Sequence, residues 1–166
     1  PTSEQKREYR LDEEPVVRIG VVLIEDQKTE MEVTVPKGGY EIRVNDAREA
    51  VVGFADCPLH VFASLDGVTI ADKTGRRLVT DVQAPQIVPP EGETPEKAGD
   101  GVLVRGVVAG RGFHWQKEID QTLSDVLEFS SHDGFLVLVN ALPLETYLVG
   151  VITGEMSGEC PIEFLK

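Results

Sequence analysis

Short apolar runs alternate with turn residues along most of the chain, which is the pattern of a β-rich protein. Residues 30–35 and 40–44 alternate polar and apolar positions on either side of a Lys-Gly-Gly turn, as half-exposed strands of a hairpin do. Residues 16–24 are nearly all apolar and predict a strand that is buried on both faces. Shorter or weaker patterns predict further strands at residues 51–54, 60–64, 68–71, 77–82, 102–108, 123–129 and 135–139. Residues 84–88 are short, and Pro85 marks them as an edge strand or a loop.

Helical periodicity is confined to the C-terminal end. Residues 140–143 break the last strand pattern, and Pro143 suits a first helical turn because its missing N–H would be unpaired there. Apolar residues then recur at helical spacing and predict a face that packs onto a core, at Leu144, Leu148, Val151 and Ile152. We expect this helix to end at Gly154 and a second one to begin at Pro161. Many strands followed by helices predict an α+β fold, a mainly antiparallel β body with short C-terminal helices.

Composition suggests four segments. Residues 1–15 are charged and polar and predict a flexible leader, and residues 16–88 form a β-rich N-terminal subdomain. Residues 89–101 combine proline, glycine and charge without periodicity, as a mobile loop or linker does. Residues 102–166 hold the remaining strands and the helices, and six residues of a second helix would not be stable alone. We therefore expect the remainder of a longer protein to complete this fold, and these residues alone to be inactive.

The net charge of −13 argues against capture of nucleic acid or anionic lipid, because both need a basic surface. It is no obstacle to a glycan. No apolar run reaches the length of a membrane span. Cys57 and Cys160 are too few for a disulfide framework, and a single bridge, two buried thiols and separate roles all stay open.

The most informative stretch is LPLETYLVGVITGEM at residues 142–156, followed by CPIEFLK at residues 160–166. Together they resemble the SpoIID/LytB family of stage II sporulation protein D-like proteins. A VRIG strand, a DG-x-x-I-x-D-x-x-G hairpin at residues 66–75 and an Arg-Gly element extend the resemblance more weakly. Residues 114–126 interrupt that last element and are interpreted as an insertion.

The resemblance implies a bacterial protein that remodels peptidoglycan outside the cytoplasm, with its signal or membrane anchor absent from these residues. The family's activity would be that of a lytic transglycosylase, which cleaves glycan strands with one acid and no cofactor. Alternatively, family members act as non-enzymatic enhancers of cell-wall amidases. A third possibility is an independent wall-binding module in residues 16–88. The resemblance does not decide the organism, the preferred glycan or a role in sporulation.

The catalytic acid implied by the resemblance is Glu155, the Glu of the Glu-Met pair. Cleavage needs a proton for the leaving oxygen, and burial between helices would raise the pKa of the carboxyl so that it could supply one. Tyr147, Arg111 and Ser157 are predicted to bind substrate, with Ser157 standing where the family usually has proline. Without the resemblance, a helix-end Glu would be interpreted as a surface residue. Glu145 is expected to be structural, because an acid in the first helical turn pairs with free backbone N–H groups.

Two other groups of residues were weighed for chemistry. One group could bind a sugar, because aromatic faces stack on pyranose rings, and consists of Arg111, Phe113, His114 and Trp115. However, Phe113 and Trp115 alternate with His114 as on a strand, which favours packing of the two aromatic side chains in the core. For His114 a structural role is preferred. Cys57 and His60 have a metal-like spacing that His132 and Cys160 could join in space. Two close residues fall short of the four ligands of a zinc site, so a buried thiol with a surface imidazole is the preferred interpretation and no metal is predicted.

Overall fold

The computed structural model describes residues 14–53, 57–90 and 101–156, with the backbone alone for residues 152–156. The chain divides into two compact units. One is Arg18–Leu142, and the other combines the described parts of Pro1–Val17 and Pro143–Lys166. The predicted α+β class with a mainly antiparallel β body is confirmed, since strands dominate and a single described α-helix follows them.

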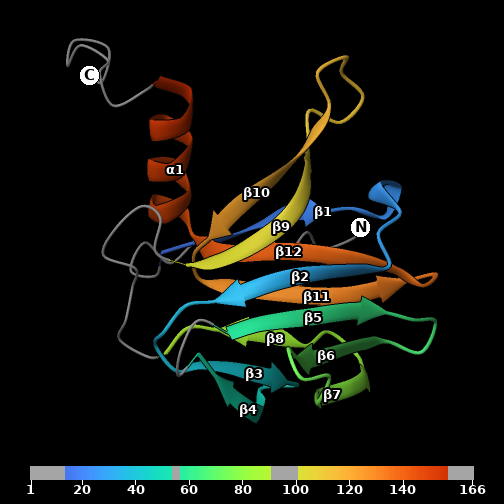
Figure 1. Ribbon diagram of the computed structural model, residues 1–166. Helices are drawn as coiled ribbons and strands as arrows, with labels where there is room; N and C mark the ends of the chain where they lie inside the picture. The colour runs from blue at the N-terminus through green and yellow to red at the C-terminus, as the bar shows by residue number, and fades with distance from the viewer. Residues whose placement is uncertain (1–13, 54–56, 91–100, 157–166) are drawn as a thin grey trace, which may run out of the picture. The chain divides into compact units, whose positions relative to one another are not determined.

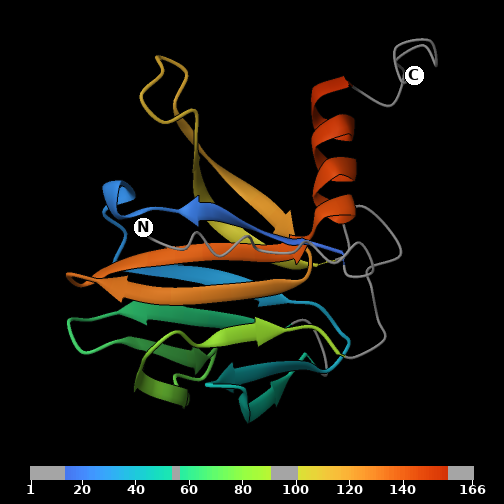
Figure 2. The same ribbon diagram turned by 180° about the vertical axis from the view of Figure 1, so that it is seen from behind.

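The strands form two six-stranded sheets that lie face to face (Figures 1 and 2). In order of neighbours, the first sheet contains β1 (Val16–Val22), β12 (Phe135–Pro143), β11 (Val126–His132), β8 (Gln86–Val88), β3 (Tyr40–Val44) and β4 (Ala47–Val52). The second contains β10 (Lys117–Leu123), β9 (Val102–Ala109), β2 (Glu30–Val35), β5 (Cys57–Ala63), β6 (Val68–Asp72) and β7 (Arg77–Val82). Every strand pair whose register is described is antiparallel.

One hydrophobic core lies between the sheets and follows from the two-residue period of the strands. On β2, Met31, Val33 and Val35 point inward while the residues between them stay partly exposed. On β11, Leu127 and Phe129 enter the same core from the opposite sheet and are 0% and 1% exposed. Residues 16–88 and the strands after residue 101 both contribute, because β2 pairs with β9 and β8 pairs with β11.

The alternating strands were predicted best. β2, β3 and β7 have the predicted bounds, and the β11–β12 hairpin closes at Asp133 and Gly134, which both have positive φ as a tight two-residue turn requires. The other expected strands are present with shifted ends.

Four strand predictions were wrong. Pro85 marked residues 84–88 as an edge or a loop, but β8 lies inside the first sheet, paired with β11 on one side and β3 on the other. β1 is not buried on both faces: it is an edge strand, and only Val21 and Val22 are buried. Residues 140–143 do not break the last strand, because Asn140 stays in register and its amide donates to the carbonyl oxygens of Ser124 and Val126. β10, within the expected insertion, was not predicted, since its sequence KEIDQTL is mostly polar and lies at a sheet edge.

The second unit holds α1 (Leu144–Met156), close to the predicted helix. The backbone N–H of Leu144 donates to the carbonyl oxygen of Pro15, and that of Glu145 donates to the Glu14 carboxylate at 2.8 Å. The helix start is thus capped from the segment before β1, as a carboxylate near a helix N-terminus should do.

On the apolar face predicted for this helix, Leu144 is half-buried, and Leu148 and Val151 are 40% and 38% exposed. The predicted second helix at Pro161 lies outside the described residues. Among the helices that the structure describes, none is long and apolar enough to cross a membrane.

We expect Phe129→Ala to lower the free energy of unfolding by about 3–5 kcal/mol, because the substitution leaves a cavity where both sheets meet. Urea denaturation monitored by circular dichroism measures the change. Leu65→Ala is the matched control: its side chain is 84% exposed, so a change within about 0.5 kcal/mol is expected. Equal losses in the two variants would contradict a core at Phe129.

Candidate functional site

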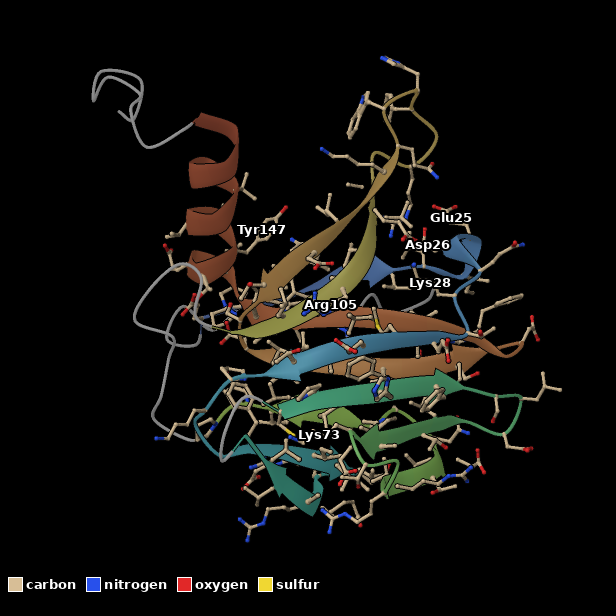
Figure 3. The ribbon with its side chains drawn as sticks, in the orientation of Figure 1. Glu25, Asp26, Lys28, Lys73, Arg105 and Tyr147 are labelled. Carbon is tan, nitrogen blue, oxygen red and sulfur yellow. The ribbon has the colours of Figure 1, made fainter. Side chains whose placement is uncertain are left out.

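The four predicted site residues fall in two units. Glu155 lies in the last turn of α1, and its side chain, like the whole of Ser157, is outside the described residues. Tyr147 is half-buried on the same helix (Figure 3). Arg111 belongs to the β body, in the connection between β9 and β10. Within neither unit do two of these four side chains meet among the described residues, and their roles in substrate binding and catalysis stay predictions.

Arg111 is held by a paired contact with Asp26. Its Nε donates to Oδ1 and its Nη2 to Oδ2, both at 2.7 Å, and Nη2 also donates to the carbonyl oxygen of Val21 at 2.6 Å. The Asp26 side chain is only 2% exposed and that of Arg111 26%. This two-point geometry is the strong, directional form of an ion pair, and it fastens the β9–β10 connection to the β1–β2 connection.

The local sequence explains why Asp26 can act as the anchor. After β1 the chain makes one 3-10 turn, η1 (Ile24–Asp26), and leaves it through Gln27 in the left-handed region at φ 51°. The backbone N–H of Leu23 donates to Asp26 Oδ2 at 2.8 Å. The turn therefore orients the Asp26 carboxylate through its own backbone, independently of the contact with Arg111.

The environment of this pair changes the pKa values of both groups. Burial alone would raise the pKa of Asp26. Hydrogen bonds from Arg111 and the Leu23 N–H, with the positive charges of Arg111 and Lys28, outweigh burial and bring that pKa below its ordinary value of 3.8. The hydrogen bond from Asp26 in turn raises the pKa of Arg111. Both groups stay charged over the physiological range.

The anchored connection, residues 110–116, carries two exposed aromatic side chains, and we call it the hairpin tip. Phe113 and Trp115 are 63% and 52% exposed, so the expectation that they fill the core was wrong. The tip extends beyond the sheets (Figures 1 and 2), where no facing sheet can cover it. Instead the two rings stack on each other, with centroids 5.5 Å apart and planes inclined by 17°. His114 between them is also exposed.

A hollow of about 660 Å³ lies between the hairpin tip and η1. Its lining is polar and charged and consists of Glu25, Asp26, Val108, Arg111, Gly112, Gln116, Lys117 and Glu118. Lys28 beside it pairs with Glu118 at 2.6 Å, and Figure 3 shows Glu25, Asp26 and Lys28 together on the β1–β2 connection. Of these residues, Arg111 was predicted from the sequence, whereas Asp26, Gln116 and Lys117 were not. The acid pair directly after an apolar strand was the only sequence signal for Asp26.

The residues with metal-like spacing have other surroundings. His60 stacks on Phe62 with ring centroids 6.2 Å apart, and Cys57 is a free, half-buried thiol. His132 is exposed next to the β11–β12 turn, and Cys160 lies outside the described residues. Within the described ranges no group of three or more His, Cys, Asp or Glu side chains is placed to hold a metal ion.

The fold and the site together define an α+β protein whose β body carries an anchored aromatic hairpin and whose motif-bearing segment begins at the end of β11. Residues 132–166 match the family model of SpoIID, the stage II sporulation protein. The predicted resemblance is thereby confirmed over this stretch, which includes Glu145, Tyr147 and Glu155. No curated protein and no solved structure matches the chain significantly.

We expect Asp26→Asn to lower the free energy of unfolding by about 3 kcal/mol, since it removes the charge that compensates Arg111 in a largely buried pair. The lowered pKa of Asp26 sets the pH dependence: the stabilisation is present above pH 3.8 and is lost as the pH falls through the lowered value. Urea denaturation from pH 7 to pH 3 measures the difference between parent and variant.

The control for this prediction is Glu25→Gln. Glu25 is also an acid beside Arg111, but it is 66% exposed and its oxygen lies 3.9 Å from Nε. A loss below about 0.5 kcal/mol is expected. If the two variants lost the same stability, or if the Asp26→Asn difference grew in acid, the anchoring role of Asp26 would be wrong.

We expect Gly110→Ala to displace Trp115, because a Cβ at Gly110 would come within 2.2 Å of the indole Cζ3. Trp115 is the only tryptophan, so its fluorescence emission, shifted to longer wavelength, reports the displacement directly. Gly112→Ala is matched to it: both residues have positive φ, at 68° and 76°, but a Cβ at Gly112 meets nothing within 4 Å. Both variants bear a backbone cost of about 1–2 kcal/mol. An unshifted emission in Gly110→Ala would contradict the described position of the indole.

Proposed function

We propose that the full-length protein remodels the bacterial cell wall as a lytic transglycosylase that cleaves peptidoglycan glycan strands, with Glu155 as its acid. The observation that carries this proposal is the match of residues 132–166 to the stage II sporulation protein family. The motif LPLETYLVGVITGEM supports it, because Glu155 occupies the position of the family's catalytic acid.

The structure of α1 is compatible with this role. The motif residues from Leu144 to Met156 form one helix, which extends two residues beyond the expected end at Gly154 and so includes Glu155. Its start is fixed by Glu14 and Pro15. Glu145 is exposed, and its backbone N–H is the group that the cap satisfies. An acid in the first turn is favoured by the helix N-terminus alone, which supports the choice of Glu155 rather than Glu145 as the proposed acid.

One acid is enough for the proposed reaction. The Glu155 carboxyl would give its proton to the glycosidic oxygen as the bond from that oxygen to the anomeric carbon breaks. The C6 hydroxyl oxygen of the same sugar would then bond to the anomeric carbon and release its proton to the Glu155 carboxylate. The products are a 1,6-anhydro sugar end and a new free hydroxyl end, and no water is consumed. A glycosidase that uses water needs a second carboxylate, which this reaction does not.

Tyr147, Ser157 and Arg111 are proposed to contact the glycan, and Tyr147 is the motif residue whose half-buried phenol suits such a contact. The acidic composition supports an uncharged or weakly charged polymer as partner and disfavours nucleic acid. A cell-wall amidase is a further proposed partner. The proposed place of action is the cell envelope.

The test is product analysis after the full-length protein and its Glu155→Gln variant are each incubated with peptide-free glycan strands. Mass spectrometry should find anhydro-muramyl ends with the parent. The variant should form at least a hundredfold fewer, because an amide cannot supply the proton. Glu145→Gln is the matched control and should retain the parent's rate.

Two outcomes would change the proposal. No cleavage by the parent would remove the enzymatic role on this substrate and favour the amidase-enhancer alternative, which needs binding without chemistry. Cleavage that persists in Glu155→Gln would assign the acid to another residue.

A further inference from the structure

We propose that the hairpin tip is a carbohydrate-binding platform, on which a sugar ring stacks against Phe113 while its hydroxyl groups bond to the polar hollow beside it. The carbohydrate class follows from the chemistry of the tip. The choice of peptidoglycan glycan among carbohydrates rests on the function proposed above. The proposed proton transfer uses Glu155 and neither of these rings, so the inference assigns the hairpin tip a binding role in which Arg111, already proposed to contact the glycan, takes part.

The two rings are arranged in a layered order. The indole of Trp115 lies directly against Gly110, where the absence of a side chain leaves room for it. Phe113 stacks on Trp115 and is the more exposed of the two rings, at 63%. An aromatic face in water is costly unless a partner covers it, and the apolar face of a pyranose has the matching size and shape.

The tip is ordered without a ligand. The backbone N–H of Phe113 donates to the Gly110 carbonyl, and that of Gln116 to the Phe113 carbonyl, each at 3.0 Å. The N–H of Gly112 donates to Gln116 Oε1, also at 3.0 Å. With the ion pair from Arg111 to Asp26 below them, the rings are held in place before binding. Such preorganisation reduces the entropy cost of ordering the tip when a sugar binds.

The hollow supplies the polar half of the platform. Its volume of about 660 Å³ falls within the range of roughly 300–1,000 Å³ typical of small-ligand sites. The ammonium group of Lys117 and the Nη1 group of Arg111 have no bonding partner among the described residues, and Gln116, whose Oε1 accepts from the Gly112 N–H, also lines the hollow. Donors beside an aromatic face suit the hydroxyl and acetamido oxygens of a sugar polymer.

Other occupants fit less well. The acids Glu25 and Glu118 line the hollow, and the chain's net charge is −13, so an anionic membrane or a nucleic acid would be repelled. Two rings also cover far less than the roughly 800 Å² that each partner of a standard protein interface buries. A glycan strand, which needs one or two stacking rings and scattered hydrogen bonds, is the partner that the surface matches.

The experiment uses Trp115 as the reporter, because it is the only tryptophan in the chain. Peptide-free glycan strands and a soluble N-acetylglucosamine hexamer are titrated into the full-length protein while tryptophan emission is recorded, with calorimetry as an independent readout. A saturable change is expected with both. Phe113→Ala should weaken binding roughly tenfold, the loss expected for a stacking contact. The variant should keep the parent's unfolding midpoint, since Phe113 is exposed.

Phe62→Ala is the matched control, an exposed aromatic on β5 at 37%, and should bind like the parent. Unchanged affinity in Phe113→Ala, or binding of anionic phospholipid vesicles without binding of glycan, would overturn the proposal. Comparison of the parent with Glu155→Gln separates the two hypotheses. Glycan binding by both proteins without cleavage by the parent would support the platform and remove the enzyme. Cleavage by the parent that Phe113→Ala leaves unchanged in KM would remove the platform alone.

Discussion

The burial of apolar stripes between two facing sheets is the constraint on which the β body depends. Strands such as β2, β5 and β11 offer alternate residues to one core, and a shift in register by one residue would move these side chains to solvent. The core is assembled from distant parts of the chain. Val33 of β2 lies opposite Val104 of β9, and Ile87 of β8 lies opposite Leu127 of β11. Strands on both sides of residues 91–100 are therefore needed to complete either sheet.

The hairpin tip extends beyond this core and needs a different source of order. Hydrophobic burial cannot hold residues 110–116, because no second sheet faces them. The paired contact between Arg111 and Asp26 replaces burial with a directional ion pair, and η1 prepares the carboxylate through the Leu23 N–H. Two large aromatic rings can then stay exposed in a fixed position. Exposed aromatics on a rigid support are costly for stability alone, and this is the physical reason to assign them to binding.

Sequence patterns predicted the strands well where one face meets the core and the other meets solvent, as in β2, β3 and β7. They failed where that contrast is weak. β10 is an edge strand with mostly polar residues, of which only Leu123 is buried while Ile119 packs against the core. β1 is apolar, although only Val21 and Val22 are buried. Phe113 and Trp115 were assigned to the core from their composition. Their exposure follows from the position of the tip beyond the paired strands, which no local pattern encodes.

The candidate acid could be predicted from a sequence motif, whereas its surroundings in the fold would not have singled it out. Glu155 follows from a motif, and its place in the last turn of α1 would by itself suggest a surface residue. Arg111 could be predicted as a candidate from the sequence around it, but its ion pair joins residues 85 positions apart and depends on the fold. The proposed chemistry and the proposed binding thus have different origins in the sequence: an ordered motif at the end of the chain for cleavage, and a tertiary contact within the β body for recognition. Arg111, Phe113 and Trp115 belong to the unit Arg18–Leu142 and Glu155 does not, so the proposed platform and the proposed acid belong to different compact units.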